Sequence, residues 1–211
     1  MVALAPAQLS LCPTNIIQLF INQESAKLIN NNEALQAFIA QGNTAKYVYF
    51  WGHQKPKSGV SKSCFSQWFD APFFEADKHF KTAEHYMMYA KAMLFNNPDI
   101  AEQIRAAQHP NEAKKLGRQV ANFDEDLWHA KRFEIVVRAN LLKFEQNPDL
   151  KRFLLDTSTR VIVEASPVDK IWGVGLAEDN PLILDPHNWQ GLNLLGYALM
   201  EVRHQLADIS S

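Results

Sequence analysis

The sequence predicts an α+β fold that is mainly helical and forms a single compact domain with a few short strands. Three observations support this prediction. The chain has 211 residues, 47% of them hydrophobic, which suits one domain with a sizeable core. Most of the chain after residue 82 divides into stretches that begin at or near Pro or Asp, as helix starts do. The two stretches richest in β-forming residues do not alternate with helices as a βαβ array would.

The N-terminal half is expected to begin with a helical segment over residues 1–44 that ends at Gly42 and packs on the domain proper, residues 45–211. Residues 45–52 (AKYVYFWG) are rich in β-formers and predict a strand. A polar loop follows over 53–63, and short extended pieces joined by turns are expected over 64–81.

The second half begins with a helix over 83–95, for which Thr82 has the side chain of an N-cap. Residues 160–166 (RVIVEAS) form a β-branched run and predict the clearest strand, followed by a loop over 167–181. Further helices are expected at 98–108, 110–120, 124–146, 148–157 and 191–208.

The composition excludes several classes of protein. A net charge of −2 does not indicate a nucleic-acid or membrane surface. No apolar run approaches the roughly 18 residues that a membrane span needs. Cys12 and Cys64 are isolated, and the N-terminus lacks a basic region before its apolar residues, so we expect a cytoplasmic protein.

The familiar catalytic motifs are absent. There is no G-x-G-x-x-G, Walker lysine motif, H-E-x-x-H or G-x-S-x-G, and the seven His are scattered. This disfavours metal and triad chemistry, so we expect no metal and no cofactor. His85 points to a different helix face from Glu84, and we interpret it as a structural histidine.

One helix places a carboxylate among residues that should be buried. Glu84, Met88, Lys91 and Phe95 follow one another at spacings of four, three and four, so they share one stripe. Burying a carboxylate is costly unless it is paired or protonated, so this placement suggests a function. The alternative is a partly exposed helix face on which Glu84 favours the positive helix end.

Two more acids lie where side chains converge on clefts. Glu164 closes the predicted strand, and Asp169 precedes Trp172 by three residues. The alternatives are that Glu164 caps a nearby loop and that Asp169 serves turn chemistry. Gly173 and Gly175 mark a tight turn or, alternatively, let backbone N–H groups approach a phosphate. We interpret the five Trp first as core residues, with stacking on a ligand as the alternative.

Four separated motifs resemble, in order, the YbiA-like or NADAR family over about residues 45–204. They are TAEHYMMYAKAMLF, FDEDLWHAKRFEIVVRANLLKFEQNPDLKRFLLDT, VIVEASPVDKIWGVGL and NWQGLNLLGYALMEVR. The resemblance implies an N-glycosidase that hydrolyses phosphoribosylamino-pyrimidine intermediates of riboflavin biosynthesis, giving ribose 5-phosphate and an aminopyrimidine. The sequence departs from the family pattern at Ser66-Gln67-Trp68, where Ser-Asn-Phe is usual, which bears on the choice of base.

From this resemblance and the residue patterns we predict a site. Glu84, Glu164 and Asp169 would share the acid, base and water-positioning roles. Substrate contacts are expected from Trp68, Lys91, Trp128, Trp172, Gly173 and Asn193. Among other long basic side chains, Arg118, Arg132, Arg138 and Lys143 could contact phosphate, although solvated helix faces are the simpler interpretation.

The expected partner is a small phosphoribosyl or ADP-ribosyl molecule, and nucleic acid is expected only as a modified-base substrate. Two alternatives remain open: an ADP-ribosyl glycohydrolase acting on ADP-ribosylated guanine, and a non-catalytic ADP-ribose-binding domain. The oligomeric state does not follow from the sequence.

Overall fold

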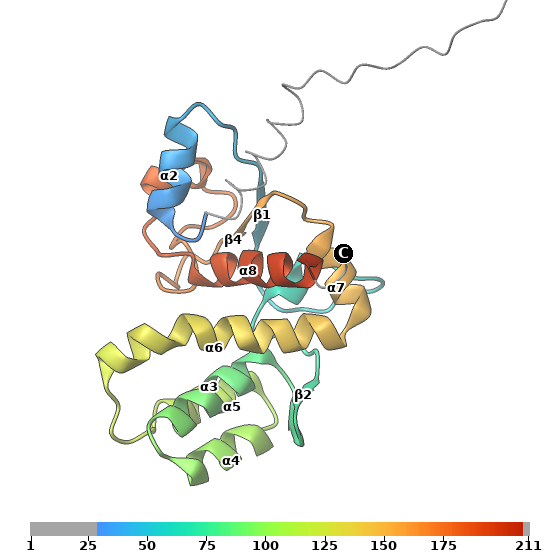
Figure 1. Cartoon of the computed structure of the whole chain (residues 1–211), viewed down its shortest axis with the longest axis vertical. Helices are drawn as coiled ribbons and strands as arrows, with labels where there is room; N and C mark the ends of the chain where they lie inside the picture. Colours follow the sequence, from blue (N-terminus) through green and yellow to red (C-terminus); the bar gives the residue numbers. More distant parts are fainter. Residues whose placement is uncertain (1–28, 209–211) are drawn as a thin grey trace, which may run out of the picture.

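The computed structural model describes residues 29–208, so the predicted helical segment lies outside the described residues up to position 28. Helices and strands follow one another as Figure 1 shows. The helices are α2 (Asn32–Ala40), α3 (Ala83–Leu94), α4 (Pro98–Ala106), α5 (Pro110–Gly117), α6 (Glu125–Gln146), α7 (Pro148–Leu155) and α8 (Leu194–Asp208). The strands are β1 (Tyr47–Phe50), β2 (Phe73–Glu75), β3 (Lys78–Phe80) and β4 (Val161–Glu164).

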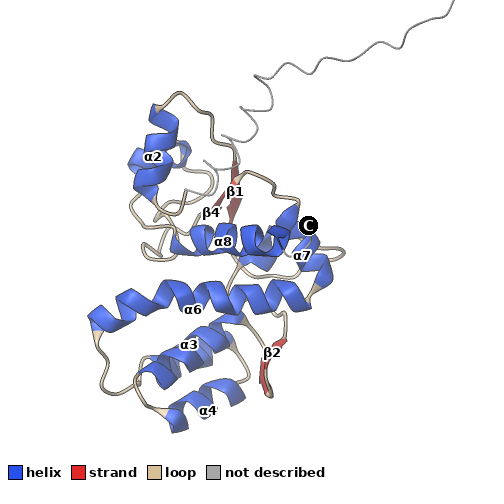
Figure 2. Cartoon of the chain, viewed as in Figure 1, coloured by secondary structure: helices blue, strands red, loops and turns tan. Residues whose placement is uncertain are grey.

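Figure 2 shows the dominance of helices over short strands, which confirms the mainly helical α+β prediction. Short 3-10 helices at Lys62–Phe65 (η1), Pro181–Leu184 (η2) and Pro186–Asn188 (η3) complete the described part. The helix predicted over 83–95 is α3, and the strand predicted over 160–166 is β4, each within two residues at either end. None of the helices in the described range is long and apolar enough to cross a membrane.

The longest helix, α6, divides the molecule into two layers (Figure 1). Helices α3, α4 and α5 pack together on one side, and α3 contacts α6. On the other side α6 packs against α8, which also covers β4. A site formed between α3 and the loop after β4 therefore draws on both layers.

The two sheets are small, with two strands each. β1 pairs with β4 in parallel, and the register places Phe50 opposite Glu164. This parallel pairing brings together strands more than a hundred residues apart in the chain. β2 and β3 form an antiparallel hairpin with Phe73 opposite Phe80. Its turn includes Ala76 at φ +50°, as predicted from the turn residues there.

Helix caps explain why the elements begin where the sequence predicts. The side chain of Thr82 accepts a hydrogen bond from the N–H of His85, as expected of an N-cap. The side chain of Asp124 accepts one from the N–H of Leu127, at 2.8 Å, at the start of α6. Pro opens α4, α5 and α7, where its missing N–H costs nothing.

His85 is fully buried in this region and both ring nitrogens have partners. Nδ1 lies 2.8 Å from the hydroxyl of Thr82, and Nε2 lies 3.3 Å from the carbonyl oxygen of Ala107. Burial lowers the pKa of His85 to about 4, so the ring is neutral at pH 7. The interpretation of His85 as a structural residue agrees with this geometry.

Helix α8 approaches β4 unusually closely at Gly196. A Cβ at this position would overlap the carbonyl oxygen of Ile162 and lie 2.5 Å from Nδ2 of Asn193. The side chain of Asn193 in turn bridges β4: its Nδ2 donates to the carbonyl of Ile162 at 2.9 Å, and its Oδ1 accepts the N–H of Glu164 at 3.0 Å. The glycine therefore lets α8 fix the end of the strand that carries Glu164.

Candidate active site

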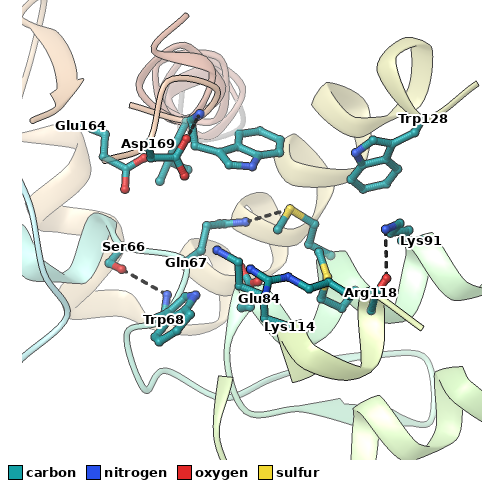
Figure 3. Close-up of a pocket in the computed structure, with 15 residues that line it drawn as sticks. Ser66, Gln67, Trp68, Glu84, Lys91, Lys114, Arg118, Trp128, Glu164 and Asp169 are labelled. Carbon is teal, nitrogen blue, oxygen red and sulfur yellow. Dashed lines mark hydrogen bonds between the residues drawn. The ribbon is translucent and has the colours of Figure 1, made fainter. Parts of the chain in front are cut away.

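A cavity of about 220 Å³ opens between the two layers (Figure 3). Most of its wall comes from helices α3 and α5 and from the segment that follows η1. The start of α6, the end of β4, the loop that follows and the start of α8 close the other side. Its lining comprises Ser66, Gln67, Trp68, Glu84, Met87, Met88, Lys91, Lys114, Gly117, Arg118, Trp128, Glu164, Asp169, Trp172 and Leu195.

Glu84 lies in the first turn of α3 and is only 3% exposed. Its backbone N–H donates to the carbonyl of Gln67 at 2.9 Å, and its Oε1 has no hydrogen-bond partner among the described residues. Burial raises the pKa of Glu84 to about 7, although Lys114 and the side chain of Trp68 favour the ionised form. A carboxyl with this pKa can donate or accept a proton near neutrality.

Glu164 reaches the same cavity from the end of β4. Its Oε2 is buried without a partner in the described part of the chain. Burial, together with the nearby charges of Asp169 and Glu84, raises the pKa of Glu164 to about 8. Two carboxyl groups from different layers thus share one partly dry space.

The carboxylate of Asp169 stabilises a backbone turn and also lines the cavity. Its Oδ1 accepts the backbone N–H groups of Ile171 and Trp172, at 2.9 and 2.8 Å. Its own N–H donates to the hydroxyl of Ser166 at 3.2 Å. The turn interpretation is therefore correct, and the same carboxylate also borders the cavity beside Glu164.

Lys91 lines the cavity but is held by neighbours other than Glu84. Its Nζ donates to the carbonyl of Gly117 at 2.9 Å and lies 4.4 Å from the ring centroid of Phe123. The ring centroid of Trp128 lies 5.7 Å from the same nitrogen. Partial burial lowers the pKa of Lys91. No ion pair joins Lys91 to Glu84 among the described residues.

Two further cations border the cavity from α5 and its C-cap. Lys114 favours the ionised forms of both Glu84 and Glu164, and Arg118 acts on Glu84 in the same direction. The Nζ of Lys114 also lies 5.8 Å from the ring centroid of Trp68. Lys114 and Arg118 are four residues apart on one helical face, so both can reach a single anionic group.

The tryptophans divide into three groups. Trp68, Trp128 and Trp172 line the cavity, and their contact with a substrate stays a prediction. Trp189 is a core residue, buried with its indole N–H donating to the carbonyl of Ile183 at 2.8 Å. Trp51 is 59% exposed, so core packing does not account for it.

Gly173 and Asn193 lie behind the cavity wall and are not among its lining residues, so the lining gives no support to their predicted contact with substrate. A Cβ at Gly173 would lie 2.8 Å from the carbonyl oxygen of Glu164, so this glycine permits close backbone packing. Its carbonyl accepts the N–H of Asn193 at 3.1 Å. Gly175, buried at φ +71°, fits the tight-turn interpretation. These residues position Glu164 and its loop.

Lys143 is fully buried, not part of a solvated helix face as the sequence suggested. Its Nζ donates to the carbonyls of Cys64 and Ser66 at 2.6 and 2.9 Å. Two aromatic rings lie near the nitrogen, with centroids at 5.8 Å (Phe69) and 5.1 Å (Phe144). Lys143 thus holds the segment that leads into Gln67 and is not among the residues that line the cavity. Burial lowers its pKa to about 8.

The sequence analysis did not identify Met87, Lys114, Gly117 and Leu195 as lining residues, and it noted Ser66 and Gln67 only within a departure from a family motif. The described residues contain no group of three or more His, Cys, Asp or Glu that could hold a metal ion. The chemistry available within the described cavity is therefore that of carboxyl groups, cations and aromatic rings.

Comparison with known proteins agrees with this chemistry. The family model of the NADAR domain matches residues 49–207. The chain is 42% identical to "N-glycosidase R617" of Acanthamoeba polyphaga mimivirus over 167 residues, covering 77% of this chain and 97% of that protein. It is 35% identical to "Riboflavin biosynthesis protein PYRR, chloroplastic" of Zea mays over 132 residues, covering 59% of this chain and 19% of that protein.

"N-glycosidase YbiA" of Escherichia coli is 32% identical over 145 residues, covering 69% of this chain and 80% of that protein. The solution structure of that E. coli protein superimposes on this fold with a TM-score of 0.62 and 28% identity, covering 80% of this chain and 89% of that chain. The chain therefore belongs to the NADAR domain family and is an N-glycosidase.

Proposed function

We propose that this N-glycosidase hydrolyses the bond between ribose and the amino nitrogen of a phosphoribosylamino-pyrimidine of riboflavin biosynthesis, releasing ribose 5-phosphate and an aminopyrimidine. The observation that carries the proposal is that Glu84, which is buried, and Glu164, which is partly buried, line one cavity bordered by cations and indole rings, each with a raised pKa. The name of the maize relative supports the riboflavin assignment.

The two carboxyl groups suit a reaction with an oxocarbenium-like transition state. One carboxylic acid donates its proton to the leaving nitrogen as the bond from C1 to nitrogen breaks. The other carboxylate accepts a proton from water as the water oxygen bonds to C1. Negative charge from Asp169 on the same wall stabilises the developing positive charge on the sugar.

The remaining lining residues match the rest of this substrate. Lys114 and Arg118 supply positive charge for the 5-phosphate, and Arg118 adds a planar donor pair suited to it. Trp68, Trp128 and Trp172 offer surfaces on which the pyrimidine can stack. The cavity volume of about 220 Å³ is small for a ligand pocket and favours a phosphoribosyl compound over an ADP-ribosyl one.

The proposal is tested by incubating the purified protein with a panel of N-ribosides and following free base and free sugar phosphate. The panel contains a phosphoribosylamino-pyrimidine, its dephosphorylated form, an ADP-ribosylated guanine nucleoside and a pyrimidine nucleotide. We expect the first to react fastest and the dephosphorylated form to show a raised KM. Faster release of ADP-ribose from guanine would assign the protein to ADP-ribosyl glycohydrolysis instead. Binding without release of any sugar would refute the proposal.

The pH dependence of kcat/KM gives a second prediction. Since catalysis needs one carboxyl protonated and one ionised, and the pKa values are about 7 and 8, we expect a bell-shaped profile with its maximum between them. The rate falls at lower pH as both groups become protonated and at higher pH as both ionise.

Asp169→Asn should move this profile to lower pH, because the charge of Asp169 raises the pKa of both Glu84 and Glu164. Asn can still accept the two backbone N–H groups through its Oδ1, so the turn is retained. Asp179→Asn, an exposed change in the same loop region, serves as the control and should leave the profile in place. An unmoved profile in Asp169→Asn would contradict the electrostatic account.

A further inference from the structure

The amide of Gln67 is fixed in one orientation at the cavity wall. The residue is 6% exposed and lines the cavity next to Trp68. Its Oε1 accepts a hydrogen bond of 2.7 Å from Nδ2 of Asn140, a fully buried residue of α6. Its Nε2 lies on the other side, 3.8 Å from the sulfur of Met87, as the dashed line in Figure 3 shows.

The orientation of Asn140 is itself determined by the helix. Its Nδ2 also donates to the carbonyl of Val136, one turn earlier, at 2.9 Å. A backbone carbonyl can only accept, so the reversed side chain of Asn140 would set two oxygen atoms against each other. The amide nitrogen of Asn140 therefore faces Gln67, and Gln67 must present its oxygen to α6 and its nitrogen to the cavity.

The backbone around Gln67 is held just as firmly. Its carbonyl accepts the N–H of Glu84 at 2.9 Å, which ties it to the start of α3. Lys143, three residues after Asn140, binds the carbonyls of Cys64 and Ser66 just before it. Two helices, α3 and α6, thus hold the backbone around Gln67, and the bond from Asn140 keeps the amide from turning over to suit a ligand.

The nitrogen of Gln67 keeps unused donor capacity. An amide nitrogen has two N–H groups, and the thioether of Met87 is a weak acceptor for one of them. We propose that Gln67 is a specificity-determining residue, which selects a leaving base that presents a carbonyl oxygen to it and rejects one that presents an amino group. This inference rests on the proposed function, because it concerns the base of the same substrate.

The base is the part of the substrate that such a donor can discriminate. A ribose hydroxyl either donates or accepts, so it would adapt to a fixed amide in either orientation. The phosphate is served by the charges of Lys114 and Arg118. The thioether of Met87, 3.8 Å from the amide nitrogen, and the indole of Trp68 on the same cavity wall supply apolar surface that suits a ring. Opposite a ring amino group, two N–H donors would face each other without an acceptor, which is costly in a buried site.

The kinetic test compares two substrates that differ in one group: a phosphoribosylamino-pyrimidine with a carbonyl at ring position 4 and its counterpart with an amino group there. We expect the protein to prefer the carbonyl compound by about tenfold or more in kcat/KM. Gln67→Met keeps a long unbranched side chain but no donor, so the preference should fall to within about threefold. Asn140 retains Val136 as an acceptor in this variant.

The exposed change Gln103→Met on α4 is the matched control and should keep the full preference. The melting temperature of each variant shows that it is folded, and Gln67→Leu provides a second donor-free variant. A Gln67→Met or Gln67→Leu protein that is folded and still prefers the carbonyl compound as the parent does would overturn the inference.

Equilibrium binding separates this inference from the proposed function. Uridine 5′-monophosphate and cytidine 5′-monophosphate differ in the same way at ring position 4, and their binding by calorimetry does not require turnover. We expect the uridine compound to bind at least about tenfold more tightly, and the difference to vanish in Gln67→Met. Equal binding, or binding of neither, would overturn the inference. Selective binding without hydrolysis would refute only the proposed reaction, and hydrolysis without selectivity only the role of Gln67.

Discussion

Glu84→Gln should lower kcat/KM for N-glycoside hydrolysis by about 100-fold or more, since a positioned acid or base contributes about 10²–10⁴. Gln is nearly isosteric with Glu but cannot exchange a proton at neutral pH. Because Glu84 lies at the start of α3 with its backbone bonded to Gln67, the substitution leaves these main-chain contacts intact. Activity is measured on the substrate of the panel that reacts fastest. A variant as active as the parent would remove Glu84 from the mechanism.

The same substitution should stabilise the fold at pH 8. The pKa of Glu84 rises from its ordinary 4.5 to about 7 on folding, because burial disfavours its charge. Below pH 4.5 the group is protonated in both states and costs nothing. As the pH rises from about 4.5 to 7, ionisation favours the unfolded chain, and above 7 the full penalty persists. Gln carries no such penalty, so the free energy of unfolding should increase by about 1–3 kcal/mol at pH 8.

Urea unfolding at pH 8 and pH 4 measures this effect, and the gain should disappear at the lower pH. Glu145→Gln, an exposed change on α6, is the matched control and should alter neither activity nor stability. A Glu84→Gln variant that is less stable than the parent at pH 8 would show that the ionised carboxylate is better satisfied than its burial indicates.

Gly196→Ala should destabilise the protein and reduce its activity together. The new Cβ would overlap the carbonyl of Ile162 and press on the side chain of Asn193, so α8 must move away from β4. Overpacking of this kind costs about 1–3 kcal/mol. Because Asn193 binds the N–H of Glu164, the shift also displaces a carboxyl of the site. We expect kcat/KM of the folded protein to fall about tenfold or more, since small misplacements of reacting groups are costly.

Gly59→Ala separates displacement of the site from general destabilisation. Gly59 has open space around the position of a Cβ, but its φ of +67° strains any other residue. This control should lose about 1–2 kcal/mol of stability while the folded fraction keeps its kcat/KM. Melting temperatures and initial rates on both variants provide the comparison. Full activity per folded molecule in Gly196→Ala would show that Glu164 tolerates movement of α8.

The sequence predicted most of the described fold because its helices and the strand β4 carry local signals. Pro and capping side chains mark the helix starts, and β-branched residues mark β4. The stripe of Glu84 with Met88 likewise predicted a buried carboxylate, since helical spacing alone places them on one face. The pairing of β1 with β4 has no local signal, because it depends on how distant segments pack.

The rest of the site could not be predicted for the same reason. Lys114 belongs to a polar helix whose sequence is ordinary, and only the docking of α5 on α3 turns it toward the carboxyl groups. Lys143 lies in a sequence pattern typical of an exposed helix face. Its buried ammonium nevertheless donates hydrogen bonds to two backbone carbonyls, those of Cys64 and Ser66. Gly173 and Asn193 lie within two of the family motifs, but they pack against the backbone of Glu164 and do not line the cavity. Only the three-dimensional packing reveals this difference.

The long helix α6 has α3 on one side and β4 on the other (Figure 1). Glu84 belongs to α3 and Glu164 to β4, so each side contributes one glutamate. A short segment of this chain grafted onto another scaffold would not keep the chemistry, because it would carry only one of the two glutamates that transfer protons. Activity consequently depends on the contact between the two layers. A change that weakens this contact abolishes catalysis even where the helices of each layer stay folded.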